Sequence, residues 1–148
     1  MPDRRYSFEV NRVSTAPPEV LFRLETDGSL WSSWAGPMIP RSRWAEYGDN
    51  GGVGAVRDLG LLPGMVRERT LEYEPDRRHV YTLDSPSPMR DYRAEVFFTP
   101  NSRGGTDLRW TGAFTERVPG SGRIVRPLLH GIIRTLSARL VKAAEHPA

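Results

Sequence analysis

The stretch SGRIVRPLLHGIIRTLSARLVKAAE, residues 121–145, decides the fold class of this protein. Apolar residues recur there at every fourth position, and two more lie beside them: Ile124, Leu128, Ile132, Leu136 and Leu140, with Leu129 and Ile133. This period predicts a long amphipathic helix whose apolar side must cover another element. Pro127 either lies in the first turn of the helix or kinks it. His130 lies off the apolar stripe and is expected at the surface or at its boundary.

The residues before this helix supply a series of short segments rich in strand-forming side chains. They recur roughly every ten residues, with turn-forming sequences such as DNGG, LLPG and SPSP between them. The predicted strands cover residues 41–48, 53–59, 64–74, 78–84, 91–99 and 105–115. The glycines of DNGGVGAV precede a strand and no Lys-Ser/Thr pair follows them, so they indicate a hairpin turn and not a phosphate-binding loop.

The amino-terminal part adds one further strand and two helices. Residues 5–14 alternate, with Tyr6, Phe8 and Val10 on one side, which is typical of a half-buried strand. The next segment, STAPPEVLFRLETDGS, predicts a helix with proline in its first turn, and a short helix carrying Trp31 and Trp34 follows it. One strand, two helices, six strands and a long helix predict an α+β fold, in which helices cover one face of an antiparallel sheet.

Composition limits the function classes. The chain has 148 residues, enough for one domain, and no cysteine, which excludes disulfides and thiolate metal sites. Its net charge is +3, but acidic residues are scattered among the arginines, so a nucleic-acid-binding surface is not expected. The three histidines share no ligand spacing, and we expect no metal and no cofactor. The charged start and the lack of a long apolar run favour a cytoplasmic protein.

Several stretches together resemble one known superfamily. They are APPEVLFRL (16–24), Trp34 before Pro37, GGVGAVRDLG (51–60), RERTLEYEPDRRHVYTL (67–83), GGTDLRWTGAF (104–114) and the closing helix. In order and spacing, over about residues 6–145, they resemble the polyketide cyclase/dehydrase-like branch of the START-like, or SRPBCC, superfamily. The resemblance implies a helix-grip fold, in which a seven-stranded curved antiparallel sheet surrounds the carboxy-terminal helix and two short helices follow the first strand. Residues 1–148 would form a single START-like ligand-binding domain.

The resemblance also implies a cavity between sheet and helix. Members of this superfamily bind lipids, sterols, polyketides or plant hormones, and some catalyse cyclisation or dehydration. An empty apolar cavity of ~300 Å³ would cost about 7 kcal/mol, so a ligand, water or bulky side chains should fill it. We expect these residues to contact the ligand: Trp34, Trp44, Val66, Thr70, Leu83, Val96, Leu108, Trp110, Leu128, Ile132 and Leu136. Trp31 is expected to fix the second helix onto the sheet, or, with Met38, to touch a membrane while a lipid exchanges.

Three residues, Glu68, Tyr81 and Arg93, are candidates for catalysis. Alternation along 64–74 predicts that Glu68 points inward, where a carboxylate must be protonated or paired, for instance with Arg57 or Arg93. Tyr81 shares the inward side of its strand and could donate a hydrogen bond to a ligand. His79, next to arginines at a strand start, is expected to be exposed.

Two main functions and one minor alternative follow from the sequence. The first is binding of one hydrophobic or aromatic molecule, lipid-like or polyketide-like, by a monomer or homodimer that makes at most transient contact with membranes. The second is a cofactor-independent polyketide aromatase/cyclase-dehydratase that uses Glu68, Tyr81 and Arg93, so whether the protein is an enzyme stays open. A third is a partner-binding module of the kind that contacts chaperones, which would show a broad exposed apolar patch.

Overall fold

The computed structural model describes residues 4–61 and 64–146. The strands are β1 (Arg5–Ser14), β2 (Ser42–Glu46), β3 (Val56–Leu61), β4 (Gly64–Glu74), β5 (Arg78–Leu83), β6 (Met89–Pro100) and β7 (Thr106–Glu116). The helices are α1 (Pro18–Thr26), α2 (Trp31–Trp34) and α3 (Gly122–Glu145). This order confirms the predicted α+β helix-grip fold, with each predicted strand and helix present within a few residues of its expected bounds.

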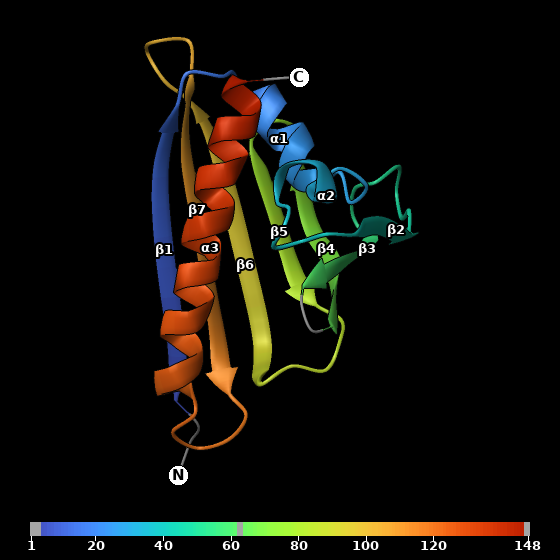
Figure 1. The fold of residues 1–148 in the computed structure, drawn as a ribbon, viewed down its shortest axis with the longest axis vertical. Helices are drawn as coiled ribbons and strands as arrows, with labels where there is room; N and C mark the ends of the chain where they lie inside the picture. Colours follow the sequence, from blue (N-terminus) through green and yellow to red (C-terminus); the bar gives the residue numbers. More distant parts are fainter. Residues whose placement is uncertain (1–3, 62–63, 147–148) are drawn as a thin grey trace.

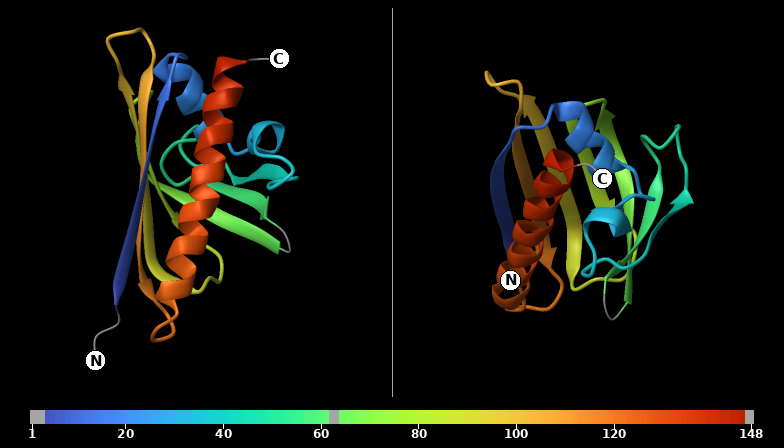
Figure 2. Two further views of the ribbon diagram at one scale, coloured as in Figure 1. Left: turned by 60° about the vertical axis from the view of Figure 1, so that its left-hand side comes forward. Right: turned by 45° about the horizontal axis from the view of Figure 1, so that its top comes forward.

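One antiparallel sheet contains all seven strands, in the order β1-β7-β6-β5-β4-β3-β2. The long helix α3 lies across one face of the sheet, near β1 and β7, and α1 and α2 lie at one end of the same face (Figure 1). Seen from the side, β3 and β4 turn away from the plane of β1 and β7 toward the side that carries α3 (Figure 2). The strong curvature leaves space between α3 and the strands β4 to β6.

The first and last strands pair along their whole length. Phe8 of β1 faces Gly112 of β7 in the register, and both lie under α3. A Cβ atom at position 112 would come within 2.3 Å of the Phe8 ring, so any larger residue there would have to displace that ring. Tyr6 and Phe114 stack farther along the same pair of strands, with ring centroids 5.6 Å apart. This half of the sheet is therefore filled by side chains.

Helix α1 begins as its sequence predicts. Pro18 is its first residue and Glu19 lies in its first turn, where the free N–H groups and the positive end of the helix dipole favour both. The side of α1 that faces the sheet buries Leu21, Phe22 and, one turn after Leu21, Glu25. Burial of a carboxylate on this face has to be compensated by partners.

The apolar stripe of α3 is buried only in its second half. Leu136 and Leu140 are buried, whereas Ile124 is 74% exposed and Leu128 is 64% exposed. Arg126 in these turns donates from Nε to the carbonyl oxygen of Ser7 at 2.7 Å, so the first turns of α3 lie against β1 while Ile124 and Leu128 stay on the exposed side of the helix. Pro127 lies inside α3, beyond its first turn. The exposed first half of the helix therefore forms part of the border of the space left by the curvature.

Candidate functional site

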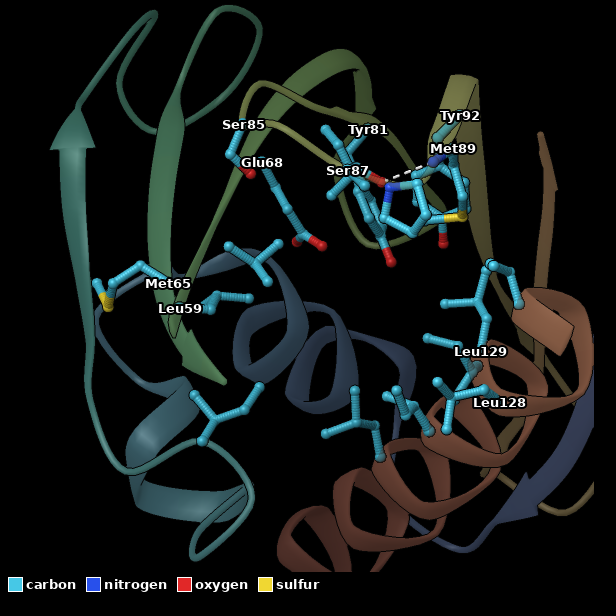
Figure 3. A pocket seen from close by; sticks show the side chains of 18 of the residues that line it. Leu59, Met65, Glu68, Tyr81, Ser85, Ser87, Met89, Tyr92, Leu128 and Leu129 are labelled. Carbon is cyan, nitrogen blue, oxygen red and sulfur yellow. Dashed lines mark hydrogen bonds between the residues drawn. The ribbon is translucent and has the colours of Figure 1, made fainter. Parts of the chain in front are cut away.

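A cavity of about 260 Å³ lies in the space between α3 and the strands β3 to β6 (Figure 3). Its lining is mostly aliphatic, and five of the predicted ligand-contacting residues belong to it: Val66, Leu83, Leu128, Ile132 and Leu136. Trp31, Leu59 and Met65 also line it. Met65 is 48% exposed and Leu128 is 64% exposed, and Pro86 and Pro88 of the lining are exposed too, so the cavity meets solvent at these side chains.

The other predicted contact residues do not line this cavity: Trp34, Trp44, Thr70, Val96, Leu108 and Trp110. Trp34 packs against Trp31 and donates a hydrogen bond from Nε1 to the carbonyl oxygen of Leu24 at 2.9 Å. Trp44 lies against Tyr47, with ring centroids 5.6 Å apart. Thr70, Val96, Leu108 and Trp110 are buried in the core. For the four strand residues buried in the core, the curvature of the sheet decides which inward-facing positions meet the cavity and which are covered. Trp34 and Trp44 lie elsewhere, in α2 and in the edge strand β2.

Trp31 is buried, which is compatible with packing of the second helix on the sheet but not with contact to a membrane. It is 1% exposed and packs edge-on against Trp110, with ring centroids 6.2 Å apart. This confirms the expectation that Trp31 holds the second helix on the sheet. It also corrects the expectation of a membrane-touching tryptophan, because a buried ring cannot reach a bilayer.

Glu68 points into the cavity from β4, as the alternation of that strand predicts (Figure 3). Its side chain is 11% exposed, and the guanidinium group of Arg57 contacts Oε1 twice, from Nε at 2.9 Å and from Nη2 at 2.8 Å. Burial raises the pKa of Glu68, and the nearby Arg57 only partly opposes that shift. Of the two partners considered for an inward Glu68, the structure selects Arg57.

Arg57 of β3 joins Glu68 to a second buried carboxylate. Its Nη2 lies 3.1 Å from Oε2 of Glu25, and its Nη1 donates to the backbone carbonyl oxygen of Glu25. The planar guanidinium group lies near two rings, 4.5 Å from the centroid of Trp31 and 5.0 Å from that of Tyr81. Carboxylates and ring faces thus surround a cation that is 2% exposed.

Glu25 is fully buried and has a second partner, His79 of β5. The distance from Nδ1 of His79 to Oε1 of Glu25 is 2.8 Å, and Nε2 of His79 lies 2.8 Å from the hydroxyl of Thr70. Although burial alone would raise the pKa of Glu25, its contacts with His79 and Arg57 hold it below its ordinary value. We call Glu25, Arg57, Glu68 and His79 the buried charge network.

The position of His79 corrects the sequence-based expectation. His79 is 1% exposed, not at the surface. It alternates with Tyr81 along β5, and both rings therefore lie on the face covered by α1 and α2, with centroids 5.3 Å apart. The neighbouring arginines favour an exposed His79, but its alternation with Tyr81 along the strand correctly indicates the inner face of the sheet. Glu25 and Arg57 were not predicted as site residues; the four-residue spacing of Leu21 and Glu25 was the available signal for Glu25.

Two tyrosines complete the polar end of the cavity. The Nε1 of Trp110 donates to the hydroxyl of Tyr81 at 3.1 Å. Burial raises the pKa of Tyr81 well above its ordinary value and also raises the pKa of Tyr92, although a hydrogen bond with Tyr81 opposes the shift of Tyr92. Both hydroxyls are therefore neutral near pH 7. They can donate or accept a hydrogen bond beside Glu68.

Arg93 and His130 lie away from Glu68 and the two tyrosines. The side chain of Arg93 is on the opposite face of the sheet, where it contacts Glu72 and, at 3.5 Å, Glu95. This corrects the expectation that Arg93 joins Glu68 and Tyr81, because residue 93 has the opposite orientation to its buried neighbours Tyr92 and Ala94. His130 is half-buried against Phe8, with ring centroids 6.3 Å apart.

The part of the chain that the structure describes contains no group of three or more His, Asp or Glu side chains arranged to hold a metal ion. Over the same residues, no helix combines the length and the apolar character needed to cross a membrane.

Comparison with known proteins supports the same fold. Residues 5–145 match the model of a family described as polyketide cyclase / dehydrase and lipid transport. The protein XoxI of Bacillus cereus is 25% identical, with a TM-score of 0.71 over 97% of this chain and 95% of that one. A search of curated proteins finds no match.

Two further solved structures share the fold at lower identity. Norcoclaurine synthase of Thalictrum flavum, in complex with dopamine and hydroxybenzaldehyde, has a TM-score of 0.77 at 12% identity, over 99% of this chain and 91% of that one. Ara h 8.0201 has a TM-score of 0.67 at 18% identity, over 94% of this chain and 99% of that one.

Proposed function

The chain belongs to the polyketide cyclase/dehydrase and lipid transport family, and on that premise we propose that it binds one hydrophobic or aromatic small molecule in the cavity beneath α3. The observation that carries this proposal is the lining of the cavity. Aliphatic side chains from β3, β4 and α3 surround it, and its few polar groups gather around Glu68. Apolar walls with a few convergent polar groups are the usual form of a small-molecule site.

The size of the cavity limits the ligand. At about 260 Å³ it lies at the small end of ligand sites, which commonly measure about 300–1,000 Å³. A fused-ring aromatic or polyketide-like molecule, or a lipid with a single short chain, fits such a volume better than a lipid with two long chains. The exposed part of the lining, which includes Met65 and Leu128, is where a ligand would enter.

Fluorescence titration with the neutral apolar probe N-phenyl-1-naphthylamine tests binding. We expect saturable enhancement of the probe and its displacement by naphthalene derivatives. Native mass spectrometry of the gently purified protein provides a second test, because a captured ligand adds its mass in the native spectrum and not after denaturation. A probe signal that rises without saturation, together with a mass equal to the polypeptide alone, would contradict the proposal.

The position of Glu68 favours a second candidate function, that of a polyketide aromatase/cyclase-dehydratase. A carboxylate with a raised pKa that faces an apolar cavity suits proton transfer. Glu68 would remove a proton from a methylene carbon between two ketone groups, and that carbon would bond to a second carbonyl carbon of the same chain. The carbonyl oxygen would receive the proton, with Tyr81 as a hydrogen-bond donor. Loss of that hydroxyl and of a proton from the adjacent ring carbon, as water, would then form a double bond in the closed ring.

Turnover of a poly-β-keto substrate analogue, followed by absorbance of the aromatic product, distinguishes the two functions. An enzyme should lose turnover in Glu68→Gln and keep it in the matched variant Glu72→Gln, because Glu72 lies on the same strand but contacts Arg78 and Arg93 on the outer face. Binding of the analogue without product formation in the wild type would leave ligand binding as the function.

A further inference from the structure

The cavity is electrostatically one-sided. Among the described residues that line it, Glu68 is the one charged side chain, and no Arg, Lys or His contributes to the wall. The remaining polar groups are neutral hydroxyls, chiefly those of Tyr81 and Tyr92. An anionic ligand would thus enter a space that offers it no cation. Transfer of an ion from water to such a space is costly unless a partner compensates it.

The nearest cation, Arg57, is not available to a ligand. All three guanidinium nitrogens already contact the carboxylates or the backbone of Glu25 and Glu68. Trp31 and Tyr81, whose rings lie against Arg57, themselves line the cavity, whereas Arg57 is 2% exposed and does not line it. Arg57 therefore acts on the ligand only by holding Glu68.

Glu68 retains one oxygen for a ligand. Both contacts from Arg57 are made with Oε1. The carboxylate extends into the cavity (Figure 3). Because Arg57 contacts Oε1 alone, Oε2 is the oxygen left to meet the contents of the site. A carboxylate oxygen is a strong acceptor, and a hydrogen bond with a charged partner is about twice as strong as one between neutral groups.

We propose that the ligand carries a hydrogen-bond donor, either a hydroxyl or an ammonium group, that binds Oε2 of Glu68, and that the cavity discriminates against carboxylate and phosphate groups. The proposal rests on the proposed ligand-binding function and names the chemistry of the polar end of the ligand. Arg57 is a positioning residue for Glu68, and the Arg57–Glu25 contact fixes Arg57 in turn.

Three naphthalene derivatives that differ only in their polar group test this proposal at pH 7.5: 2-naphthol, 2-(aminomethyl)naphthalene and 2-naphthoic acid. Each is used to displace N-phenyl-1-naphthylamine. The informative comparison is between the two ions, because an apolar site without a carboxylate would reject both. We expect the ammonium compound and 2-naphthol to displace the probe at concentrations at least about tenfold lower than 2-naphthoate.

Variants test whether Glu68 causes the preference for the ammonium compound. Glu68→Gln should remove the preference for the ammonium compound over 2-naphthoate, and the control Glu72→Gln should keep it. In case Glu68→Gln fails to fold, as judged by circular dichroism, Leu128→Lys leaves the buried charge network intact and places a cation at the exposed mouth. This variant should strengthen binding of 2-naphthoate by several-fold.

Two results would overturn the proposal. If 2-naphthoate displaces the probe from the wild type as well as the other compounds do, selectivity is absent, while the proposed binding function stands. If 2-naphthoate gains nothing from Leu128→Lys, charge at the cavity does not govern its binding. Failure of the probe itself to bind would be a different outcome, since it would reject the binding function and the selectivity together.

Discussion

The carboxylate of Glu25 in α1 lies 2.8 Å from Nδ1 of His79 in β5, although 54 residues separate the two along the chain. Each side chain is almost completely buried. The contact joins the first helix to the centre of the sheet, and through Arg57 it reaches Glu68 at the cavity. The buried charge network, which holds Glu68 at the polar end of the cavity, is therefore built on one helix and three strands, β3, β4 and β5.

Replacement of Glu25 by glutamine should destabilise the protein strongly. The amide keeps the shape of the side chain but leaves Arg57 with one carboxylate partner, and the loss of one member of a buried ion pair typically costs about 3–5 kcal/mol. Urea unfolding at pH 7 measures the change. Glu19→Gln, on the exposed side of the same helix, is the control and should change stability little. Equal stability of both variants would contradict the importance of the network.

The acid limb of the stability curve should report the same carboxylate. Because the folded-state pKa of Glu25 is lowered from 4.5, its ionised form adds stability above that pH, and this stability is lost as the pH falls through the lowered value. Thermal unfolding between pH 7 and pH 3 should therefore show a steeper loss in the wild type than in Glu25→Gln. Parallel curves would indicate that other carboxylates account for the acid sensitivity.

Replacement of Tyr81 by phenylalanine should destabilise the core without creating a large cavity. The indole N–H of Trp110 donates to the Tyr81 hydroxyl and would lose its acceptor, which typically costs about 1–3 kcal/mol for a buried group. Tyr47→Phe, at a ring that is 57% exposed, should be nearly neutral in the same denaturant series. A neutral Tyr81→Phe would show that Trp110 finds another acceptor.

Binding of a cationic ligand should weaken on acidification at a higher pH than an ordinary glutamate would produce. Burial raises the pKa of Glu68 above 4.5, so the carboxylate takes up its proton, and loses its attraction for a cation, before the pH has fallen to 4.5. Displacement titrations with 2-(aminomethyl)naphthalene between pH 8 and pH 4.5 measure this. The affinity of Glu68→Gln should be independent of pH over that range. If the affinity of the wild type is also independent of pH, the ammonium group does not bind at Glu68.

A larger side chain at position 132 should block binding while the fold persists. Ile132 lines the cavity and is half-buried, so Ile132→Trp would occupy space that a ligand needs. We expect at least about tenfold weaker binding of N-phenyl-1-naphthylamine. Ile124→Trp, on the same helix at a position 74% exposed, is the matched control and should bind the probe normally. Full affinity in Ile132→Trp would show that the probe binds at another site, such as the groove lined by Trp34 and Arg139.

Part of the candidate site was predictable from the sequence. The alternation along β4 correctly directed Glu68 inward, and that of β5 correctly directed Tyr81, because successive side chains of a strand point to opposite faces. The prediction that Arg93 joins Glu68 is wrong by the same rule, since residue 93 alternates with the buried Tyr92 and Ala94 and its side chain pairs with Glu72 and Glu95 on the outer face. The prediction of an exposed His79 is wrong because its period-two relation to Tyr81, and not the charge of the adjacent arginines, decides its side of the sheet.

The sequence by itself determined the order and type of the secondary-structure elements, the burial of Phe8 and Leu140, and the inward direction of Glu68, since all of these follow from local periodicity. Only the tertiary structure decided that Glu25, Arg57 and His79 meet, and that Val66 and Leu83 line a cavity whereas Val96 and Trp110 lie in the solid core. The physical reason is the curvature of the sheet. It sums small twists over seven strands, and thereby sets which inward-facing residues meet a helix and which face the space beside it.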